Sequence, residues 1–463
     1  MLTHGCRLNQ YETDGIAASF ADAGHERVEQ PADADLVVVN TCTVTQAADL
    51  EGRRLVRRLA SRLGPGRVVV TGCSAQRDPE PYAAVRGVRL VAGNSHKERL
   101  LELVGATTPA AGETAVADAG SAAVPVLVEP PAGARPESRV RSLSAGGRSA
   151  NARAYLRVQD GCSQSCTFCS LPEVRGTSAS LPLAAVRREA TQLAAAGHGE
   201  IVLTGAHLGS YGYDLAPRVP LATLIEAVLE AAPSCRVRLS SLEPRGVGPD
   251  LLRLLAVEPR VCPHLHLPLQ SGDDRVLAGM RRAYRSGPYA ERAWAAAEAV
   301  RAAAGEGAPG LALGSDFIVG FPGEDDAAFA ATVDLVERLP FTYGHVFPYS
   351  DRPGTPAAAL GGRGRPDVVR RRSAVLRRLL RRKGLEFRRA HLGAVVEIVV
   401  ESVEAAAQPA AGAWLARGTS ERFLQVRVPG LGPAPPVASR LRVRVTAAGE
   451  VGLVGEVRPP MLG

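Results

Sequence analysis

Six short apolar runs, each separated from the next by a segment of helical periodicity, occupy the middle of the chain and constrain its fold more than any other feature. The runs are AYLRVQDG at 154–161, EIVLTG at 200–205, RVRLSSL at 236–242, HLHLPL at 264–269, LALGSDFIVG at 311–320 and FTYGHVFPYS at 341–350. Strands separated by helices form parallel sheets. Six such units exceed a small open sheet and fall short of the eight of a closed barrel. The pattern predicts an α/β fold with a partial (β/α)6 barrel over residues 151–362.

A shorter alternation comes first in the chain. Apolar runs at 36–40, 67–72 and 88–93 alternate with helical segments such as 51–63. We therefore expect an N-terminal parallel α/β sheet domain over residues 1–103. Residues 104–150 are rich in Ala, Gly, Pro and Ser with little periodicity, which predicts a linker.

The C-terminal part changes character twice. Residues 363–389 carry twelve Lys and Arg against Asp367 and Glu386, which predicts a basic helix over 363–390. Residues 391–463 contain VVEIVVE, RFLQVRV and LRVRVTA between Gly and Pro, the pattern of a small antiparallel β-barrel. With a net charge of +8, helix and barrel together favour a polyanionic partner. The alternatives are a solvated helix face and an unspecialised β-domain.

The composition narrows the compartment and the use of cysteine. The chain has no run of eighteen apolar residues, and MLTHGCRLNQ has no signal-peptide pattern, so we expect a cytoplasmic protein that does not enter a membrane. In a reducing cytoplasm the eight cysteines are poor disulfide candidates. A tight cysteine cluster is therefore better explained by metal binding or catalysis.

Three cysteines follow the first barrel strand at C-x3-C-x2-C spacing. Cys162, Cys166 and Cys169 lie in the loop at its C-terminal end, which is the catalytic face of such barrels. A structural zinc site closes with four protein ligands, and the nearest histidines, His96 and His198, are far away in sequence. Three thiolates instead suit an iron–sulfur cubane with one iron open to a further ligand.

A second trio is scattered in the N-terminal domain. Cys6, Cys42 and Cys73 each follow a predicted strand, although the first of these strands is almost entirely missing from the chain. Because parallel strands end at one edge of a sheet, the three can converge there and hold a second open cluster. The alternative is that they are small buried hydrophobes. For Cys235 and Cys262, which have no such placement, we predict core packing.

The motifs as a whole resemble the methylthiotransferases of the radical S-adenosylmethionine (SAM) superfamily. The matching segments are CRLNQYET at 6–13, NTCTVTQAAD at 40–49, TGCSAQ at 71–76, YLRVQDGCSQSCTFCSLPEVRG at 155–176, EIVLTGAHLGSYG, RLSSLEP, HLHLPLQSGDDRVLAGMRR, DFIVGFPGE and FPYSDRPGTPA. The C-terminal barrel is similar to the TRAM domain, an RNA-binding module. The resemblance implies two 4Fe–4S clusters, one SAM molecule as methyl donor and a second as radical source.

The short motifs also indicate a branch of the family. NTCTVT followed by AD, with NQYET and LTG-x-x-LGSYG, resembles the branch that acts on threonylcarbamoyladenosine next to the tRNA anticodon. Sibling branches modify isopentenyladenosine in tRNA or an aspartate of a ribosomal protein. The implied product carries a methylthio group on carbon 2 of the adenine. The implied partners are the tRNA anticodon stem-loop and an electron donor such as flavodoxin or ferredoxin, and we expect a monomer.

The resemblance also assigns site residues. Cys162, Cys166 and Cys169 would ligate the SAM cluster, and Cys6, Cys42 and Cys73 the auxiliary cluster. The residues assigned to SAM are Thr204, Gly205, Ser240, Ser241, Glu243, Gln270, Ser271 and Asp316. Each of these non-cysteine residues has the alternative of strand-end capping or turn formation. Phe168 either shields the cluster or adenine, or simply packs.

Two readings from other functional classes stay open at this point. One is an iron–sulfur electron carrier or sensor without turnover, which would leave SAM intact on reduction. The other is a zinc-bearing RNA-binding protein, which would contain zinc in place of iron and sulfide.

Overall fold

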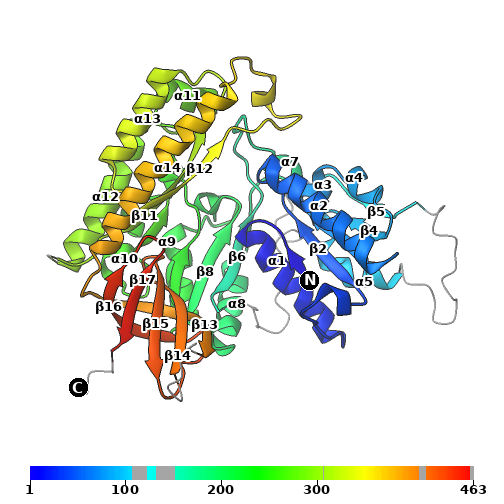
Figure 1. Cartoon of the computed structure of the whole chain (residues 1–463), viewed down its shortest axis with the longest axis horizontal. Helices are drawn as coiled ribbons and strands as arrows, with labels where there is room; N and C mark the ends of the chain where they lie inside the picture. The colour runs from blue at the N-terminus through cyan, green and yellow to red at the C-terminus, as the bar shows by residue number, and fades with distance from the viewer. Residues whose placement is uncertain (107–122, 132–151, 306, 406–412, 459–463) are drawn as a thin grey trace.

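The computed structural model describes residues 1–106, 123–131, 152–305, 307–405 and 413–458. Most of the predicted linker lies outside these ranges. Within them the chain forms an N-terminal sheet domain, a central partial barrel and a C-terminal barrel, in the predicted order (Figure 1). In the described part of the chain, no helix has the length and apolar character needed to cross a membrane.

The N-terminal domain is the predicted parallel α/β domain. Its strands are β1 (Leu2–Thr3), β2 (Val37–Thr41), β3 (Val68–Gly72), β4 (Val88–Ala92) and β5 (Val126–Leu127), and its helices α1 (Arg7–Asp22), α2 (Gln46–Leu63), α3 (Cys73–Arg77), α4 (Glu80–Ala83) and α5 (Leu100–Ala106). The strands are parallel in this order. Successive valines of a strand point to opposite faces, so Val37 and Val39 pack with α2 while Val38 packs with α1 and α5. Both faces are thus buried, as parallel sheets require.

The central domain contains six parallel strands. The strands are β6 (Ala154–Asp160), β8 (Glu200–Gly205), β9 (Arg236–Leu239), β10 (His264–His266), β11 (Ala312–Val319) and β12 (Tyr343–Pro348), with a short antiparallel β7 (Ala179–Ser180) beside β6. The helices are α7 (Leu171–Arg175), α8 (Leu183–Ala195), α9 (Leu221–Ala231), α10 (Pro249–Val257), α11 (Asp274–Gly279), α12 (Ser286–Ala304), α13 (Asp326–Arg338) and α14 (Pro366–Arg389). Bridges at Val237↔Val261 and Ser241↔His266 connect β9 to β10 and make one open barrel wall. The predicted partial barrel is therefore confirmed.

The two faces of this wall differ in chemistry. Outward-facing residues such as Leu156, Leu203 and Leu265 belong to the main hydrophobic core beneath the helices. The alternate positions are polar and face the inside of the barrel, as Arg238 and His266 do. Polar side chains that can bind a ligand therefore line the inside of the barrel, and the apolar core lies between the strands and the surrounding helices.

The C-terminal domain is a closed five-stranded barrel. Its strands are β13 (Val395–Ala405), β14 (Ala413–Ser420), β15 (Gln425–Leu431), β16 (Arg440–Ala448) and β17 (Leu453–Val457), in the order β13-β14-β15-β17-β16. The pairs are antiparallel except β15 with β17. Valines on alternate positions fill its centre.

The predicted basic helix is α14, and it covers the last strand of the central barrel. Its apolar stripe, which includes Leu376 and Leu380, is buried in the main core. Its outer face exposes Arg370, Arg378 and Arg381. The helix therefore has a packing role on one face and a charged surface on the other.

Buried charges join the C-terminal barrel to the start of the central strands. Glu200 accepts hydrogen bonds from Arg236 at 2.7 Å and Arg238 at 2.8 Å. The same arginines donate to the carbonyls of Thr419 at 2.9 Å and Ser420 at 2.8 Å. The C-terminal barrel thereby closes the N-terminal end of the central barrel and leaves the catalytic end to other elements (Figure 1).

We expect Glu200→Gln to destabilise the protein by about 3–5 kcal/mol, because it leaves two buried arginines without their counter-ion. Burial alone would raise the pKa of Glu200, but Arg238 and Arg236 outweigh burial and hold it below 4.5. The stabilisation is therefore complete at neutral pH and is lost as the pH falls below 4.5. Urea unfolding at several pH values measures both effects. Glu226→Gln removes an exposed pair with Arg253 and should cost at most about 1 kcal/mol; equal losses would contradict the assignment.

Candidate active site

The C-x3-C-x2-C loop is fixed in place by its own backbone and by two distant segments. Thr167 donates from its backbone N–H to the carbonyl of Met280 at 3.1 Å and from its hydroxyl to Gly279 at 2.9 Å. The carbonyl of Thr167 accepts from the N–H of Ala357 at 2.9 Å. These bonds attach the loop at the C-terminal end of β6 to Gly279, Met280 and Ala357.

The three sulfurs of this loop receive N–H donors. The backbone N–H groups of Gln164 and Leu171 point to Cys162 at 3.5 Å and Cys169 at 3.4 Å. Arg282 donates to Cys166 at 3.0 Å. Burial raises the pKa of Cys162 to about 12 and also raises that of Cys169. Burial makes these thiols costly to ionise, but a bound metal deprotonates the thiols that ligate it. The N–H donors around the sulfurs then stabilise the thiolates, so the loop suits metal ligation.

The second trio meets at the edge of the N-terminal sheet. The pairing of β1 with β2 is only two residues long, but it brings Cys6 next to Cys42. Gly5, between them in space, has φ +124°, and a Cβ there would lie 2.6 Å from the sulfur of Cys42. A hydrogen bond with Cys42 lowers the pKa of Cys6 to about 6, and the charge of Cys73 contributes to the raised pKa of Cys42. The three predicted strand ends therefore converge.

Neither trio is arranged around a single ion. Among the residues that the structure describes, no three His, Cys, Asp or Glu side chains are grouped so as to hold one metal ion. In a cubane, each thiolate binds a different iron, so the sulfurs need not point to one centre. The all-sulfur donor set fits such a cluster better than zinc.

Arg175, at the end of α7, connects the two trios. It donates to the sulfur of Cys73 at 3.3 Å, to Asn9 at 3.1 Å and to Glu12 at 2.8 Å, all in the N-terminal domain. It also donates to Asp160, just before the cysteine loop, at 3.0 Å. Both domains are thus held to one guanidinium.

A second arginine bridges the domains from the other edge of the barrel. Arg352, in the loop after β12, donates to the carbonyl of Thr43 and to the hydroxyl of Ser170 at 3.2 Å. Arg77 returns a hydrogen bond from α3 to the carbonyl of Pro353 at 2.8 Å. Because α1 also packs against β6, the N-terminal domain contacts both β6 and the loop after β12.

The residues assigned to SAM divide into two groups. Thr204, Ser240 and Glu243 are buried at the C-terminal ends of β8 and β9. Ser271 is also buried, but its hydroxyl lies 3.4 Å from that of Thr332 and accepts from the N–H of Asp273. Ser271 therefore makes the turn contacts that were the alternative to ligand binding.

The other assigned residues lie near the same end of the barrel. Gly205 is the last residue of β8, and a Cβ at this position would lie 2.7 Å from Oε1 of Gln159. Ser241 is exposed beside β10, and Gln270, at φ 69°, bridges to β11. Asp316 lies 3.1 Å from His266 inside the barrel. Their roles toward SAM stay predictions.

Glu243 is the best supported of these candidates by its electrostatics. Burial would raise its pKa, but the imidazole of His207, whose Nε2 lies 3.1 Å from the carboxylate, and a hydrogen bond from Arg282 lower it. Arg282 also contacts Cys166, so a charged chain runs from Glu243 to the cysteine loop. A carboxylate kept ionised there can accept from a cationic ligand group.

The remaining aromatic and cysteine predictions concern packing. Phe168 packs against a small cluster that includes Met280 and Phe321, which supports the packing alternative. Cys235 and Cys262 are buried, as predicted, and Cys235 donates to the carbonyl of His198 at 2.9 Å.

Sequence reasoning missed the arginines that hold the site. Arg175 and Arg352 both stand in quoted motifs, LPEVRG and FPYSDRPGTPA, but nothing local marks them as buried bridges. Arg282 likewise ends the motif HLHLPLQSGDDRVLAGMRR, and nothing local marks it as a partner of Cys166 and Glu243. Their partners lie in distant segments, which a single sequence does not reveal.

The fold and the loop identify the class of protein. Residues 156–336 match the model of the radical SAM superfamily. The radical SAM methyltransferase TsrM from Kitasatospora setae, solved with cobalamin and a 4Fe–4S cluster, has a similar fold with a TM-score of 0.56 and 17% identity, over 77% of this chain and 73% of that chain. The chain is a radical SAM protein.

The N-terminal domain specifies the family more closely. Residues 1–93 match a model described as uncharacterized protein family UPF0004. Threonylcarbamoyladenosine tRNA methylthiotransferase MtaB from Aquifex aeolicus is 34% identical, over 83% of this chain and 88% of its own length. Ribosomal protein uS12 methylthiotransferase RimO from Roseiflexus castenholzii is 34% identical, over 99% of this chain and 95% of its own length. The chain therefore belongs to the radical SAM methylthiotransferase family, and it is similar to both MtaB and RimO.

We expect Arg175→Gln to separate the two domains and to reduce iron binding at the N-terminal trio. The change removes the cation that Glu12 and Asp160 share. Glu12 keeps Lys97 and both carboxylates keep Arg157, so we expect a cost of about 1–3 kcal/mol for the lost charge-assisted hydrogen bonds. After anaerobic reconstitution, iron should fall from about eight toward about four per chain, and trypsin should release the N-terminal domain sooner. Arg187→Gln, which breaks an exposed pair with Glu230, is the matched control. Full iron content in Arg175→Gln would contradict the bridging role.

Proposed function

We propose that the protein methylthiolates carbon 2 of N6-threonylcarbamoyladenosine at position 37 of tRNA. The observation that carries the proposal is that Arg175 donates both to Cys73 of the N-terminal trio and to Asp160, just before the cysteine loop that follows β6. A carbon with no acidic proton and no leaving group requires radical chemistry, and the sulfur must be held within reach. The MtaB relative and the N-terminal motifs favour the adenosine as substrate.

In this proposal the chain's residues bind, orient and shield. Cys162, Cys166 and Cys169 would hold one 4Fe–4S cluster, and the N-terminal trio a second. When bound, the clusters and two molecules of SAM would supply the radical and the methylthio group. Glu243, kept ionised by His207 and Arg282, would accept from the amino group of SAM. A one-electron donor such as flavodoxin or ferredoxin would complete the system, with the protein acting as a cytoplasmic monomer.

The proposed tRNA surface lies on the outer faces of β16 and α14. Exposed arginines alternate along β16 at positions 440, 442 and 444, and three more lie on the outer face of α14. Phosphate contacts from arginine supply the sequence-independent part of RNA affinity. These positions, together with the β-barrel, support an RNA partner.

A second candidate is the aspartate of ribosomal protein uS12. The RimO relative supports it, because that relative matches 99% of this chain. The C-terminal barrel and the two cysteine trios fit either substrate.

Deletion of the gene should abolish 2-methylthio-threonylcarbamoyladenosine in tRNA, because in this proposal the protein is the enzyme that forms the carbon–sulfur bond. Mass spectrometry of tRNA nucleosides measures the loss, and complementation with the intact gene should restore it. Unchanged methylthio-adenosines together with loss of methylthio-aspartate in uS12 would assign the protein to the second candidate.

Cys42→Ala and Cys166→Ala should separate the two cluster functions. Reconstituted Cys42→Ala is expected to lose about half of its iron and all methylthiolation, yet still form 5′-deoxyadenosine when reduced with dithionite. Cys166→Ala should lose both activities. Cys235→Ala, which removes a buried thiol outside both trios, is the control and should keep both. Full iron content and product formation in Cys42→Ala would disprove the two-cluster arrangement.

A further inference from the structure

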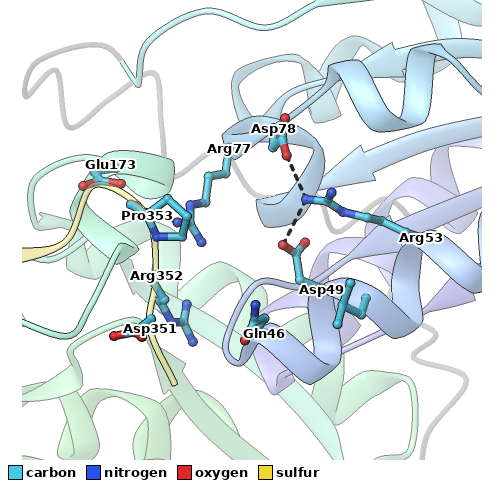
Figure 2. Close-up of a pocket in the computed structure, with 10 residues that line it drawn as sticks. Gln46, Asp49, Arg53, Arg77, Asp78, Glu173, Asp351, Arg352 and Pro353 are labelled. Atoms are coloured by element: carbon cyan, nitrogen blue, oxygen red, sulfur yellow. Dashed lines mark hydrogen bonds and ion pairs between the residues drawn. The ribbon is translucent and has the colours of Figure 1, made fainter. Parts of the chain in front are cut away.

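A cavity of about 480 Å³ lies between the N-terminal domain and the loop after β12 (Figure 2). Side chains from α2, α3 and α7 line it together with residues 351–353 of the loop. Figure 2 shows Arg77 and Arg352 on the side of the loop, with Asp49 and Arg53 across from them. The cavity thus lies at the junction that joins the two cysteine trios.

The cavity is directly connected to both cluster loops. Thr43, Ser74 and Ser170 each follow a cysteine of one trio or the other in sequence. Arg352 contacts Thr43 and Ser170, and Asp49 accepts a hydrogen bond from Ser74. Two lining residues, Arg352 and Asp49, therefore contact the residues that directly follow Cys42, Cys73 and Cys169. A group bound in the cavity lies beside the reaction centre.

Three arginines and four carboxylates line the cavity, and they are not all paired with one another. Asp351 pairs with Arg363, outside the lining, at 3.0 Å, and Glu173 makes no ion pair within the described ranges. Arg53 forms ion pairs with Asp49 at 3.2 Å and with Asp78 at 2.8 Å. Within the described ranges, Arg77 and Arg352 donate only to uncharged acceptors, namely the carbonyls of Thr43 and Pro353 and the hydroxyls of Thr43 and Ser170. Burial lowers the pKa of Arg352, which shows that its surroundings disfavour the charge. Two neighbouring guanidinium groups without a carboxylate partner are suited to an anionic ligand.

We infer that this cavity binds the threonylcarbamoyl group of the target adenosine, with Arg77 and Arg352 pairing with its carboxylate. The inference rests on the proposed function and names the residues that would determine its substrate specificity. Gln46 and Glu173 can accept from the urea N–H or the hydroxyl, and Leu50, 46% exposed, can contact the methyl group. The cavity holds a charged, hydrogen-bonding substituent better than the apolar isopentenyl group.

The covalent structure of the substrate supports this placement. The threonylcarbamoyl group is attached at N6, and only ring atoms N1 and C6 separate this nitrogen from carbon 2. When carbon 2 is held between the two clusters, the substituent must therefore extend into the immediate surroundings of the cluster loops. The cavity beside Thr43 and Ser170 lies in these surroundings.

The test is the binding of two free nucleosides to the anaerobically reconstituted full-length protein. Threonylcarbamoyladenosine and unmodified adenosine are titrated into wild type, Arg352→Gln and Arg77→Gln by calorimetry. Each variant should weaken binding of the modified nucleoside about tenfold or more, as expected for loss of a charge-assisted pair, and leave adenosine unchanged. Iron content and SAM cleavage without substrate are measured in parallel, and a variant that loses either would show that the arginine supports the fold, which would contradict the binding role. Arg77→Lys should restore part of the affinity, and Arg57→Gln, on the outer face of α2, should have no effect.

The results distinguish failure of the inference from failure of the proposed function. If wild type modifies threonylcarbamoyladenosine in tRNA but both variants keep its affinity for the modified nucleoside, the cavity is not the binding site. If both nucleosides lose affinity equally, the arginines support the fold and the inference is also wrong. If wild type modifies only a uS12 aspartate peptide, the proposed function fails and the inference fails with it.

Discussion

The arrangement of this protein depends on one buried guanidinium. Arg175 is 5% exposed and lies among the thiol of Cys73 and the carboxylates of Glu12 and Asp160. A charge in that position is tolerated only while its partners surround it, because an uncompensated buried charge costs several kcal/mol. The N-terminal domain therefore cannot move away from the barrel without a large penalty. The same contacts hold Cys73 of the N-terminal trio near Asp160, which precedes the cysteine loop.

The other domain contacts restrict how a substrate can approach. The C-terminal barrel closes the start of the central strands through Arg236 and Arg238. The N-terminal domain contacts β6 and the loop after β12, which are the two edges of the open wall. The mouth of the barrel and the adjoining cavity remain for ligands. A macromolecular substrate must then present its reacting atom at the end of a slender group, as an extruded base or an extended side chain does.

The sequence predicted the parts of the site that depend on strand ends. Parallel strands end at one edge, so the position of a cysteine just beyond a strand was sufficient to bring Cys6, Cys42 and Cys73 together. The bridging arginines could not be found in this way, because Arg175 and Glu12 are 163 residues apart. Polar residues at strand ends are equally ambiguous: Ser271 bonds Thr332 and Asp273, whereas Glu243 lies between His207 and Arg282.

Helix α14 illustrates why charge counts alone do not define an RNA surface. Arg372 is buried and pairs with Glu324 at 2.6 Å, and Arg382 pairs with Glu337 on α13. Such arginines hold the helix on the barrel and release few counterions when RNA binds. Arg370 and Arg378 are exposed and make no ion pair among the described residues, so a phosphate can reach them. Because the salt dependence of binding scales with the phosphates neutralised, it is set by the exposed arginines and not by the twelve basic residues of the segment.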